Sequence, residues 1–282
     1  MRLIRDVGRM SRLARAWRRR AEAVGLVPTM GALHEGHLAL IRAAARAHRI
    51  VVVSIFVNPL QFGPSEDYRR YPRPLARDLR LARSAGADVA FVPAANQMYP
   101  EGFSTEVLVR GAAERFEGAI RPGHFLGVAT VVARLFGIVQ PSRAFFGQKD
   151  YQQLLVIRRM VEDLRVPVVI RMHPTVREPD GLALSSRNAY LTAAQRRQAA
   201  GLYDALRRAA AQIRQGARDP QAIARAARRR LARVPGLRVD YVAAVRASDL
   251  APLRVLRGRV VLLGAVRLGG TRLIDNVLVD VP

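Results

Sequence analysis

Apolar runs and helical patterns alternate along the first 175 residues of the chain. The apolar runs are short and rich in valine and isoleucine, as in IVVVSIFV from residue 50. An unbroken run of this kind suits a strand buried on both faces of a sheet, and the alternation favours a doubly wound, Rossmann-like parallel sheet in an α/β fold. The predicted strands are residues 25–29, 50–56, 88–92, 143–146 and 166–172, and the predicted helices are residues 36–47, 75–85, 126–139 and 151–164.

The pattern changes after residue 175. A polar, turn-rich segment is followed by two long Ala/Arg helices at residues 192–215 and 220–233, and then by β-like runs at residues 239–245, 260–267 and 273–279. We interpret this half as a smaller α+β domain. The predicted domains are therefore residues 1–175, which are Rossmann-like, and residues 176–282.

Composition narrows the class of protein. Half of the 282 residues are hydrophobic, which predicts a folded globular protein, and no apolar run reaches the roughly 18 residues that a membrane span requires. The basic N-terminus lacks the apolar core of a secretory signal. The chain has no cysteine, which excludes disulfides and thiolate chemistry. A cytoplasmic enzyme fits these features.

The formal charge of +25 raises the possibility of a nucleic-acid-binding protein. The arginines are spread along the chain, and aromatic residues make up only 6% of it, so stacking platforms are scarce. Among the 47 basic residues only Lys149 is a lysine. A site that needs a compact ammonium group explains that exception better than a general surface charge does.

Two histidines stand three residues apart in PTMGALHEGH, where a predicted strand gives way to a helix. A helix N-terminus attracts phosphate, and Gly36 would let a phosphate approach the backbone. His34 and His37 would lie on one helical face and could stabilise charge on a phosphorus atom. Zinc is the competing interpretation, but the zincin pattern has a spacing of four and a third ligand is not indicated.

The segment FFGQKD places the single lysine at a second strand-to-helix junction. Gly147 would permit a tight turn, Lys149 would bind a phosphate as a point charge, and Asp150 could bond ribose hydroxyls. The chain has no P-loop motif and no GxSxG motif. Because ligands gather at the carboxyl ends of parallel strands, this segment, PTMGALHEGH and NPLQF would share one edge of the sheet.

Two further segments offer polar groups. LALSSRN, from residue 182, has two hydroxyls and a guanidinium that suit a flap over a triphosphate, although a turn capped by serines explains it equally well. Gln61 in NPLQF and Gln153 in KDYQQ are neutral amides that could hold the hydroxyls and carboxylate of a small polar substrate.

Taken together, PTMGALHEGH, SIFVNPLQF, YPR, FFGQKDYQQL, PTVREPDGLALSSRN and RLGGTRLIDN closely resemble the pantothenate synthetase (pantoate–beta-alanine ligase) family of the HxGH nucleotidyltransferase superfamily. The resemblance implies a Rossmann-like domain, a smaller lid domain and a homodimer. It implies that pantoate attacks ATP, assisted by Mg²⁺, to give pantoyl adenylate and pyrophosphate. Beta-alanine then displaces AMP to give pantothenate, a precursor of coenzyme A.

The resemblance also assigns roles to residues. His37 is implied as the catalytic proton donor, with His34 and Lys149 on phosphate, and Val176 next to adenine. Gln61, Gln153 and Asn58 would bind pantoate, and Gln61 would also bind beta-alanine, while Arg121 and His124 in RPGHF rank lower. The implied ATP-binding residues are Met30, Gly31, Ala32, Leu33, His34, Glu35, Gly36, His37, Gly147, Gln148, Lys149, Asp150, Val176, Leu184, Ser185, Ser186 and Arg187, of which the last four resemble the KMSKS-like loop of the superfamily.

The chain departs from the family pattern at several positions. Leu60 and Leu184 stand where many relatives have methionine, and Gln148 where glutamate is common. Near Asp78, relatives often carry a more acidic run linked with Mg²⁺, whereas Arg77 precedes Asp78 here. No metal-binding residue is therefore predicted, and Mg²⁺ would be held mainly by phosphates and water. Partners are the small-molecule substrates, with no specific nucleic acid and no membrane. An adenylyl- or cytidylyltransferase with another acceptor and a nucleic-acid-binding protein are the alternatives.

Overall fold

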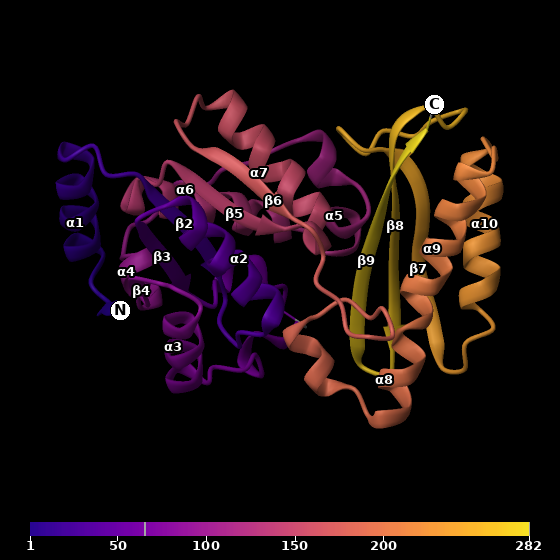
Figure 1. Cartoon of the computed structure of the whole chain (residues 1–282), viewed down its shortest axis with the longest axis horizontal. Helices are drawn as coiled ribbons and strands as arrows, with labels where there is room; N and C mark the ends of the chain where they lie inside the picture. Colours follow the sequence, from indigo (N-terminus) through magenta and orange to yellow (C-terminus); the bar gives the residue numbers. More distant parts are fainter. Residues whose placement is uncertain (65, 282) are drawn as a thin grey trace. The chain divides into compact units, whose positions relative to one another are not determined.

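The computed structural model describes residues 1–64 and 66–281 (Figure 1). Short 3-10 turns lie between the main elements, of which η1 (Pro59–Gln61), η4 (Gln148–Asp150) and η5 (Ser186–Tyr190) matter below. The main elements are β1 (Arg2–Ile4), α1 (Val7–Arg19), β2 (Val24–Thr29), α2 (Glu35–Ala47), β3 (Ile50–Ile55), α3 (Leu75–Ser84), β4 (Val89–Phe91), α4 (Ala95–Met98), α5 (Glu117–Ile120), α6 (His124–Val139), β5 (Arg143–Gly147), α7 (Tyr151–Asp163), β6 (Val169–His173), α8 (Ala193–Ala199), α9 (Gly201–Arg214), α10 (Pro220–Leu231), β7 (Leu237–Arg246), β8 (Gly258–Leu268) and β9 (Thr271–Val281).

The chain forms two compact units. Unit 1 contains residues 1–147 and 152–174, and unit 2 contains residues 148–151 and 175–282. The short segment 148–151, which includes Lys149, therefore groups with the later part of the chain, although the first predicted domain includes it. Each unit is described separately below.

Unit 1 is built on a six-stranded sheet in the order β1-β4-β3-β2-β5-β6, and all of its strand pairs are parallel. Strand β3 is buried along its whole length, as expected for a strand covered on both faces. Side chains of α2 and α3, among them Leu38, Ile41 and Ala82, pack with Val27 and Val53 into a core on one face. The predicted Rossmann-like α/β fold is confirmed.

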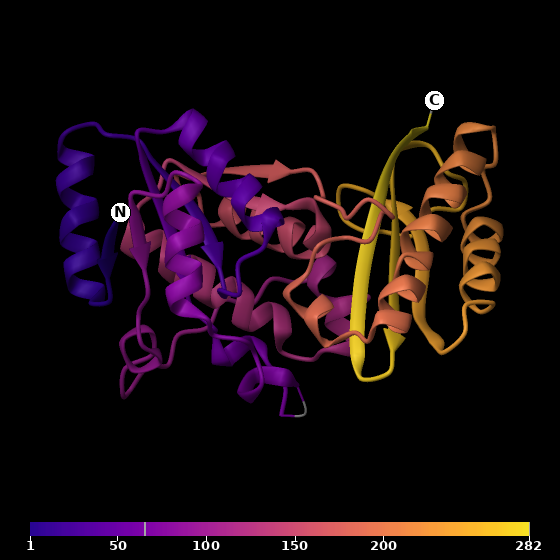
Figure 2. The same ribbon diagram turned by 60° about the horizontal axis from the view of Figure 1, so that its bottom comes forward.

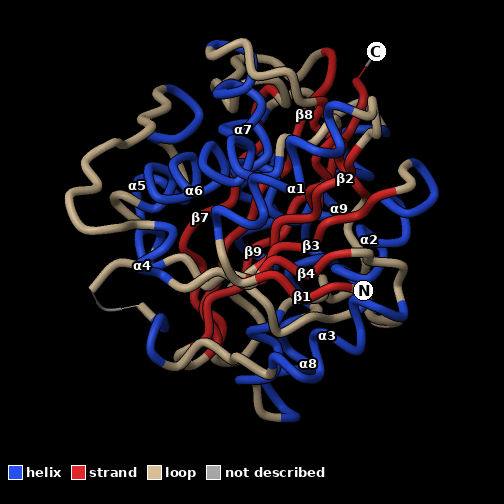
Figure 3. Tube along the Cα trace, turned by 90° about the vertical axis from the view of Figure 1, so that its left-hand side faces the viewer, coloured by secondary structure: helices blue, strands red, loops and turns tan. Residues whose placement is uncertain are grey.

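The strand order reverses direction between β2 and β5. The chain runs from β2 through α2 to β3 and through α3 to β4, whereas from β5 it runs through α7 to β6 on the other side. Right-handed crossovers then place α1, α6 and α7 on the face opposite α2 and α3, and Figure 3 shows α6 and α3 on opposite sides of the strands. Ligands of such sheets bind at the carboxyl ends of the strands that flank the reversal.

Unit 2 contains the three-stranded antiparallel sheet β7-β8-β9 with α9 and α10 packed against it (Figures 1 and 2). Apolar side chains at helical spacing on α9, such as Leu202, Leu206 and Ile213, meet Val260 and Leu262 of β8 in one core. This arrangement is the smaller α+β part expected from the sequence.

Two parts of the chain differ from the prediction. The basic N-terminal segment forms β1 and α1, whose Met10, Ala14 and Trp17 are buried, although no element was predicted there. The helix predicted at residues 192–215 is two helices, because α8 ends at Ala199 and α9 begins at Gly201.

Within the described residues, no helix is long and apolar enough to cross a membrane.

Candidate active site

A buried carboxylate accepts hydrogen bonds from the backbone of the turn after β2. Gly31 and Ala32 both have positive φ, at 83° and 50°, so their neighbouring backbone N–H groups point inward together. Asp78, which reaches over from α3, accepts the N–H groups of Ala32 and Leu33, each at 2.8 Å. A Cβ on Gly31 would lie 3.0 Å from an oxygen of Asp78, so glycine suits this position on two grounds.

Asp78 is therefore engaged with backbone rather than presented to solvent. Its side chain is buried, and burial raises its pKa, although the two N–H groups and Arg77 act in the opposite direction. Among residues 1–64 and 66–281, no group of three or more His, Asp or Glu side chains is placed to hold a metal ion.

The histidine pair lies at the N-terminus of α2, with one residue outside the helix. His34 is the N-cap residue and His37 occupies the third helical position, so the spacing of three brings the two side chains together at the start of the helix. Their ring centroids are 4.0 Å apart. The backbone N–H of His34 donates to Nδ1 of His37 at 3.3 Å, so the neutral ring of His37 carries its proton on Nε2.

Gln61 lies close to this turn. Its amide nitrogen donates to the sulfur of Met30 at 3.0 Å, and its carbonyl oxygen accepts from Nδ2 of Asn58 at 3.2 Å. The buried Asn58 also donates to the carbonyl of Gly127 at 3.0 Å and accepts from the hydroxyl of Tyr99 at 2.7 Å. The structure thus brings Met30 together with Asn58 and Gln61, which lie in a distant part of the sequence.

The backbone of Gln61 is fixed from α6. His124 donates from Nδ1 to the Gln61 carbonyl at 2.9 Å and accepts at Nε2 from Arg121 at 3.0 Å. Arg121 in turn makes a two-bond ion pair with Glu66, each bond 2.7 Å long. Burial, and then the adjacent Arg121, lowers the pKa of His124 to about 4, so this ring is neutral at physiological pH.

A close backbone approach completes this part of unit 1. A Cβ on Gly127 would lie 2.2 Å from the carbonyl oxygen of Leu60, so only glycine lets α6 pack this tightly on η1. Gln153 lies in the first turn of α7 and is half-buried. Its neighbour Gln152 uses its amide group to bind the backbone of Ala112, Arg115 and Glu117.

The lysine segment differs from expectation in one respect. Gly147 is the last residue of β5 and has no positive φ, so the turn that follows it does not depend on the conformational freedom of glycine. Open space surrounds its Cα, because a Cβ there would meet no atom within 4 Å among the described residues. The turn is η4, in which Nζ of Lys149 lies 3.5 Å from Oδ1 of Asp150.

The segment that contains Val176 and Leu184 is a short hairpin. The N–H of Leu184 donates to the carbonyl of Val176 at 3.1 Å, and Arg177 pairs with Ala183. Beyond the hairpin, Ser185 caps η5 by accepting the N–H of Arg187 at 3.3 Å, as the serine-capped-turn alternative expects. Val176 and Leu184 thus face each other across the hairpin, and residues 185–187 follow it directly.

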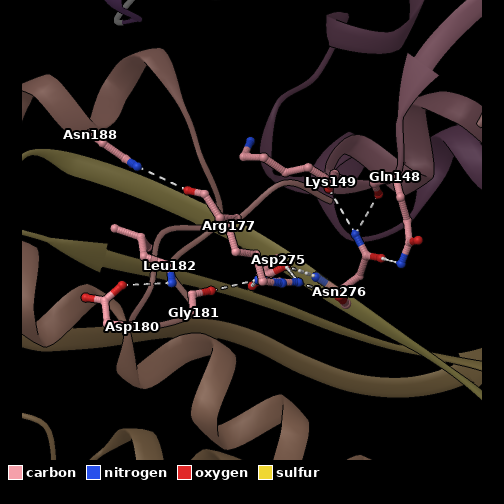
Figure 4. A network of polar contacts seen from close by, with 10 residues as sticks. Gln148, Lys149, Arg177, Asp180, Gly181, Leu182, Asn188, Asp275 and Asn276 are labelled. Atoms are coloured by element: carbon pink, nitrogen blue, oxygen red, sulfur yellow. Dashed lines mark hydrogen bonds and ion pairs between the residues drawn. The ribbon is translucent and has the colours of Figure 1, made fainter. Parts of the chain in front are cut away.

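Unit 2 also contains residues that sequence reasoning left without a role. Asp275 and Asn276 of β9 bind the hairpin and the lysine turn, as Figure 4 shows. Their signal in the sequence is two consecutive polar residues between the apolar runs LI and VLV of this strand, within RLGGTRLIDN. In unit 1 the corresponding signals are Asp78 on an amphipathic helix and the RPGHF segment.

Comparisons of the sequence and of the structure with known proteins point to the same family. A family model described as pantoate-beta-alanine ligase matches residues 2–278. The chain is 54% identical over 281 residues to the pantothenate synthetase of Moorella thermoacetica, covering 100% of this chain and 99% of the relative. The crystal structure of pantothenate synthetase from Thermus thermophilus has a TM-score of 0.93 at 52% identity, covering 98% and 99% of the two chains. That of pantoate-beta-alanine ligase from Francisella tularensis, complexed with beta-gamma ATP and beta-alanine, has a TM-score of 0.81 at 34% identity, covering 99% and 97%.

Proposed function

Because the chain belongs to the pantoate–beta-alanine ligase family, it is an enzyme that joins pantoate to beta-alanine with ATP, and we propose that it does so through a pantoyl adenylate. A carboxylate oxygen of pantoate attacks the α-phosphorus of ATP, and pyrophosphate leaves with the electron pair of the broken P–O bond. The amine of beta-alanine then attacks the acyl carbon, AMP leaves, and the nitrogen loses a proton. The products are pantothenate, AMP and pyrophosphate.

The observation that carries this proposal is the histidine pair at the N-terminus of α2. The pair directly follows β2, which flanks the point where the strand order reverses, so phosphate binding is expected there. Since Nδ1 of His37 accepts a backbone N–H, the proton of the neutral ring lies on Nε2, and we propose that this group donates to a phosphate oxygen. We assign His37 as the proton donor, with His34 beside it and residues 30–37 as ATP-binding.

Gly147 of unit 1 and several residues of unit 2 supply the other ATP contacts that we propose. Gly147 ends β5, the second strand flanking the reversal, and open space at its Cα would admit a ligand. Gln148 follows it in the chain. Lys149 would bind a phosphate and Asp150 the ribose. Val176 would meet adenine, and Leu184, Ser185, Ser186 and Arg187 the phosphates, which is supported by their positions on one hairpin and the turn after it.

For pantoate we propose direct contacts from Gln61 and Gln153, with Gln61 also near beta-alanine. Asn58 is placed behind Gln61, because its buried amide is already bonded to Gln61, Gly127 and Tyr99. It would then orient Gln61 toward the pantoate. The neutral pair of amides suits a substrate with hydroxyl groups and one carboxylate.

We propose that Mg²⁺ enters the site as an ion carried by ATP. The described residues offer no cluster of carboxylates and histidines for it, and Asp78 is bonded to backbone. Mg²⁺ commonly keeps several waters and binds substrate phosphates, whose charge it would neutralise here. We also propose that residues 1–175 bind ATP and pantoate, that residues 176–282 act as a lid, and that the enzyme is a cytoplasmic homodimer.

The experiment that tests the function follows ATP consumption with pantoate, beta-alanine or both. Sustained release of AMP and pyrophosphate only when both substrates are present supports the ligase. Consumption that is indifferent to pantoate would favour a nucleotidyltransferase with another acceptor, whereas salt-sensitive nucleic-acid binding without turnover would favour the nucleic-acid-binding alternative.

A substitution then tests the role of the histidine pair. His37→Ala should lower kcat by at least about 100-fold, as loss of a positioned proton donor does, while the protein stays folded. His173→Ala, on β6 outside the pair, is the matched control and should retain its rate. A folded His37→Ala protein with the wild-type rate would refute the assignment.

A further inference from the structure

Strand β9 presents two consecutive buried polar residues, Asp275 and Asn276, which are 4% and 1% exposed. Asn276 faces the lysine turn. Its Nδ2 donates to the carbonyl oxygens of Gln148 at 2.8 Å and of Lys149 at 3.0 Å, and its Oδ1 accepts from the side chain of Gln148 at 3.1 Å (Figure 4). One amide group therefore fixes the backbone on which the single lysine stands.

Asp275 holds the hairpin through Arg177. The guanidinium of Arg177 donates to both carboxylate oxygens of Asp275, at 2.6 and 2.9 Å, and to the carbonyl of Gly181 at 3.0 Å. It also lies over the ring of Tyr203, 3.7 Å from its centroid. Arg177 follows Val176 directly, so this contact fixes the strand of the hairpin from which Val176 projects.

We propose that Asp275 and Asn276 are positioning residues that hold two nucleotide-binding segments, the lysine turn at residues 148–150 and the hairpin at residues 176–184, in one fixed arrangement on β9. The proposal rests on the function proposed above, since it presumes that both segments bind ATP. Neither residue touches the nucleotide. Each acts by fixing backbone, so that the cation of Lys149 and the contacts at Val176 are preorganised before ATP arrives.

The choice of asparagine follows from the polarity of the turn. Two carbonyl oxygens point at the same place, so the group that meets them must donate two hydrogen bonds, which a carboxamide does and a carboxylate does not. Asn276→Asp keeps the shape of the side chain and the acceptor that faces Gln148. It sets an oxygen against the two carbonyls, and the turn that carries Lys149 must then move.

The test compares Asn276→Asp with wild type in the binding of a non-hydrolysable ATP analogue and in the Michaelis constants for ATP and beta-alanine. We expect the affinity for the analogue to fall, and KM for ATP to rise, by at least about tenfold, with KM for beta-alanine within about twofold of wild type. A purely structural role would lower the amount of folded enzyme and leave both Michaelis constants unchanged. Asn96→Asp, at an exposed position on α4, controls for the added charge.

Asn276→Ala keeps the test decisive if the aspartate variant does not fold. It removes the donors without adding an opposed charge, so it should weaken ATP binding by less than Asn276→Asp but still severalfold. Wild-type KM for ATP in a folded Asn276→Ala or Asn276→Asp enzyme that makes pantothenate would overturn the inference and leave the function standing. An inactive wild-type enzyme with pantoate, beta-alanine and ATP would instead overturn the proposed function.

Discussion

The two units hold their proposed substrate-binding segments with similar devices built from different groups. In each unit one buried side chain bonds two consecutive backbone groups of a turn, and one arginine–carboxylate pair holds a neighbouring segment. Unit 1 uses Asp78 for the turn and Arg121 with Glu66 for the segment of Gln61. Unit 2 uses Asn276 for the turn and Arg177 for the hairpin, paired with Asp275.

The difference in the first device reflects the polarity of the two turns. Positive φ at Gly31 and Ala32 turns N–H groups inward, and a carboxylate accepts them. The lysine turn directs carbonyl oxygens inward, and only a donor such as Asn276 satisfies them. The chemistry of the supporting residue is therefore dictated by backbone conformation, and Asp and Asn are not interchangeable at either place.

The difference in the second device is burial. The carboxylate of Asp275 is 3% exposed, whereas that of Glu66 is 23% exposed. We expect Arg177→Met to lower the free energy of unfolding by about 3–5 kcal/mol, because it leaves the buried carboxylate of Asp275 without its cationic partner. Arg121→Met should cost only about 1 kcal/mol, because Glu66 can regain water. Denaturant titration of both variants measures the contrast.

A double substitution separates two effects of Arg177→Met: the loss of the ion pair, and the cost of leaving the Asp275 charge buried. Arg177→Met with Asp275→Asn removes the charge yet keeps an oxygen that can accept the N–H of Asn276, so it should recover part of the lost stability. The surface variant Arg225→Ala, which breaks an exposed pair with Asp219, should change stability by less than about 1 kcal/mol. Equal losses for Arg177→Met and Arg121→Met would show that burial does not distinguish the two units.

The second prediction concerns pH. The backbone of Gln61 is held by His124, which can titrate, whereas the lysine turn is held by Asn276, which cannot. The groups facing His124 are Arg121, Glu66 and Glu117. The folded pKa of His124 is about 4 against 6.5 when unfolded, so the unfolded chain binds more protons between these values and stability falls as pH falls through them. The full shift corresponds to roughly 3 kcal/mol.

Measurements of unfolding between pH 7 and 4 check this expectation. His124→Gln, which cannot titrate, should flatten the acid loss over that range. Glu66 adds to the loss near the lower end: burial opposes ionisation of Glu66, but the hydrogen bond and charge of Arg121 prevail and lower its pKa. The same slope in wild type and His124→Gln would place the acid sensitivity elsewhere.

The fold was largely predictable because its signals are local. Runs such as residues 50–56 are apolar throughout, and the alternation with helices specifies a parallel sheet. The N-terminal helix was missed because its apolar positions, Met10, Ala14 and Trp17, are diluted by arginines. The break between α8 and α9 falls among alanines and a glycine, where the pattern of apolar positions hardly changes.

The candidate site was predictable only in part, for a related reason. His34, His37 and Lys149 stand out because rare residue types occur at strand-to-helix junctions. The supporting residues Asp78, Asn276 and His124 act across 45 to 128 positions of the chain, on backbone groups whose orientation depends on φ values that composition does not reveal. Their roles therefore required the coordinates.

The last prediction concerns Asp78→Asn, the reciprocal of Asn276→Asp. The amide can accept only one of the N–H groups of Ala32 and Leu33 and sets its own donor against the other. Leaving a buried N–H without a partner costs about 1–3 kcal/mol, but removal of a carboxylate whose pKa is raised by burial offsets part of this, so we expect about 1–2 kcal/mol. Because the histidine turn loses its fixed shape, kcat should fall by about tenfold or more while KM for beta-alanine changes little. A folded Asp78→Asn enzyme with unchanged kcat would mean that the turn keeps its shape without the carboxylate, and the parallel with Asn276 would then fail.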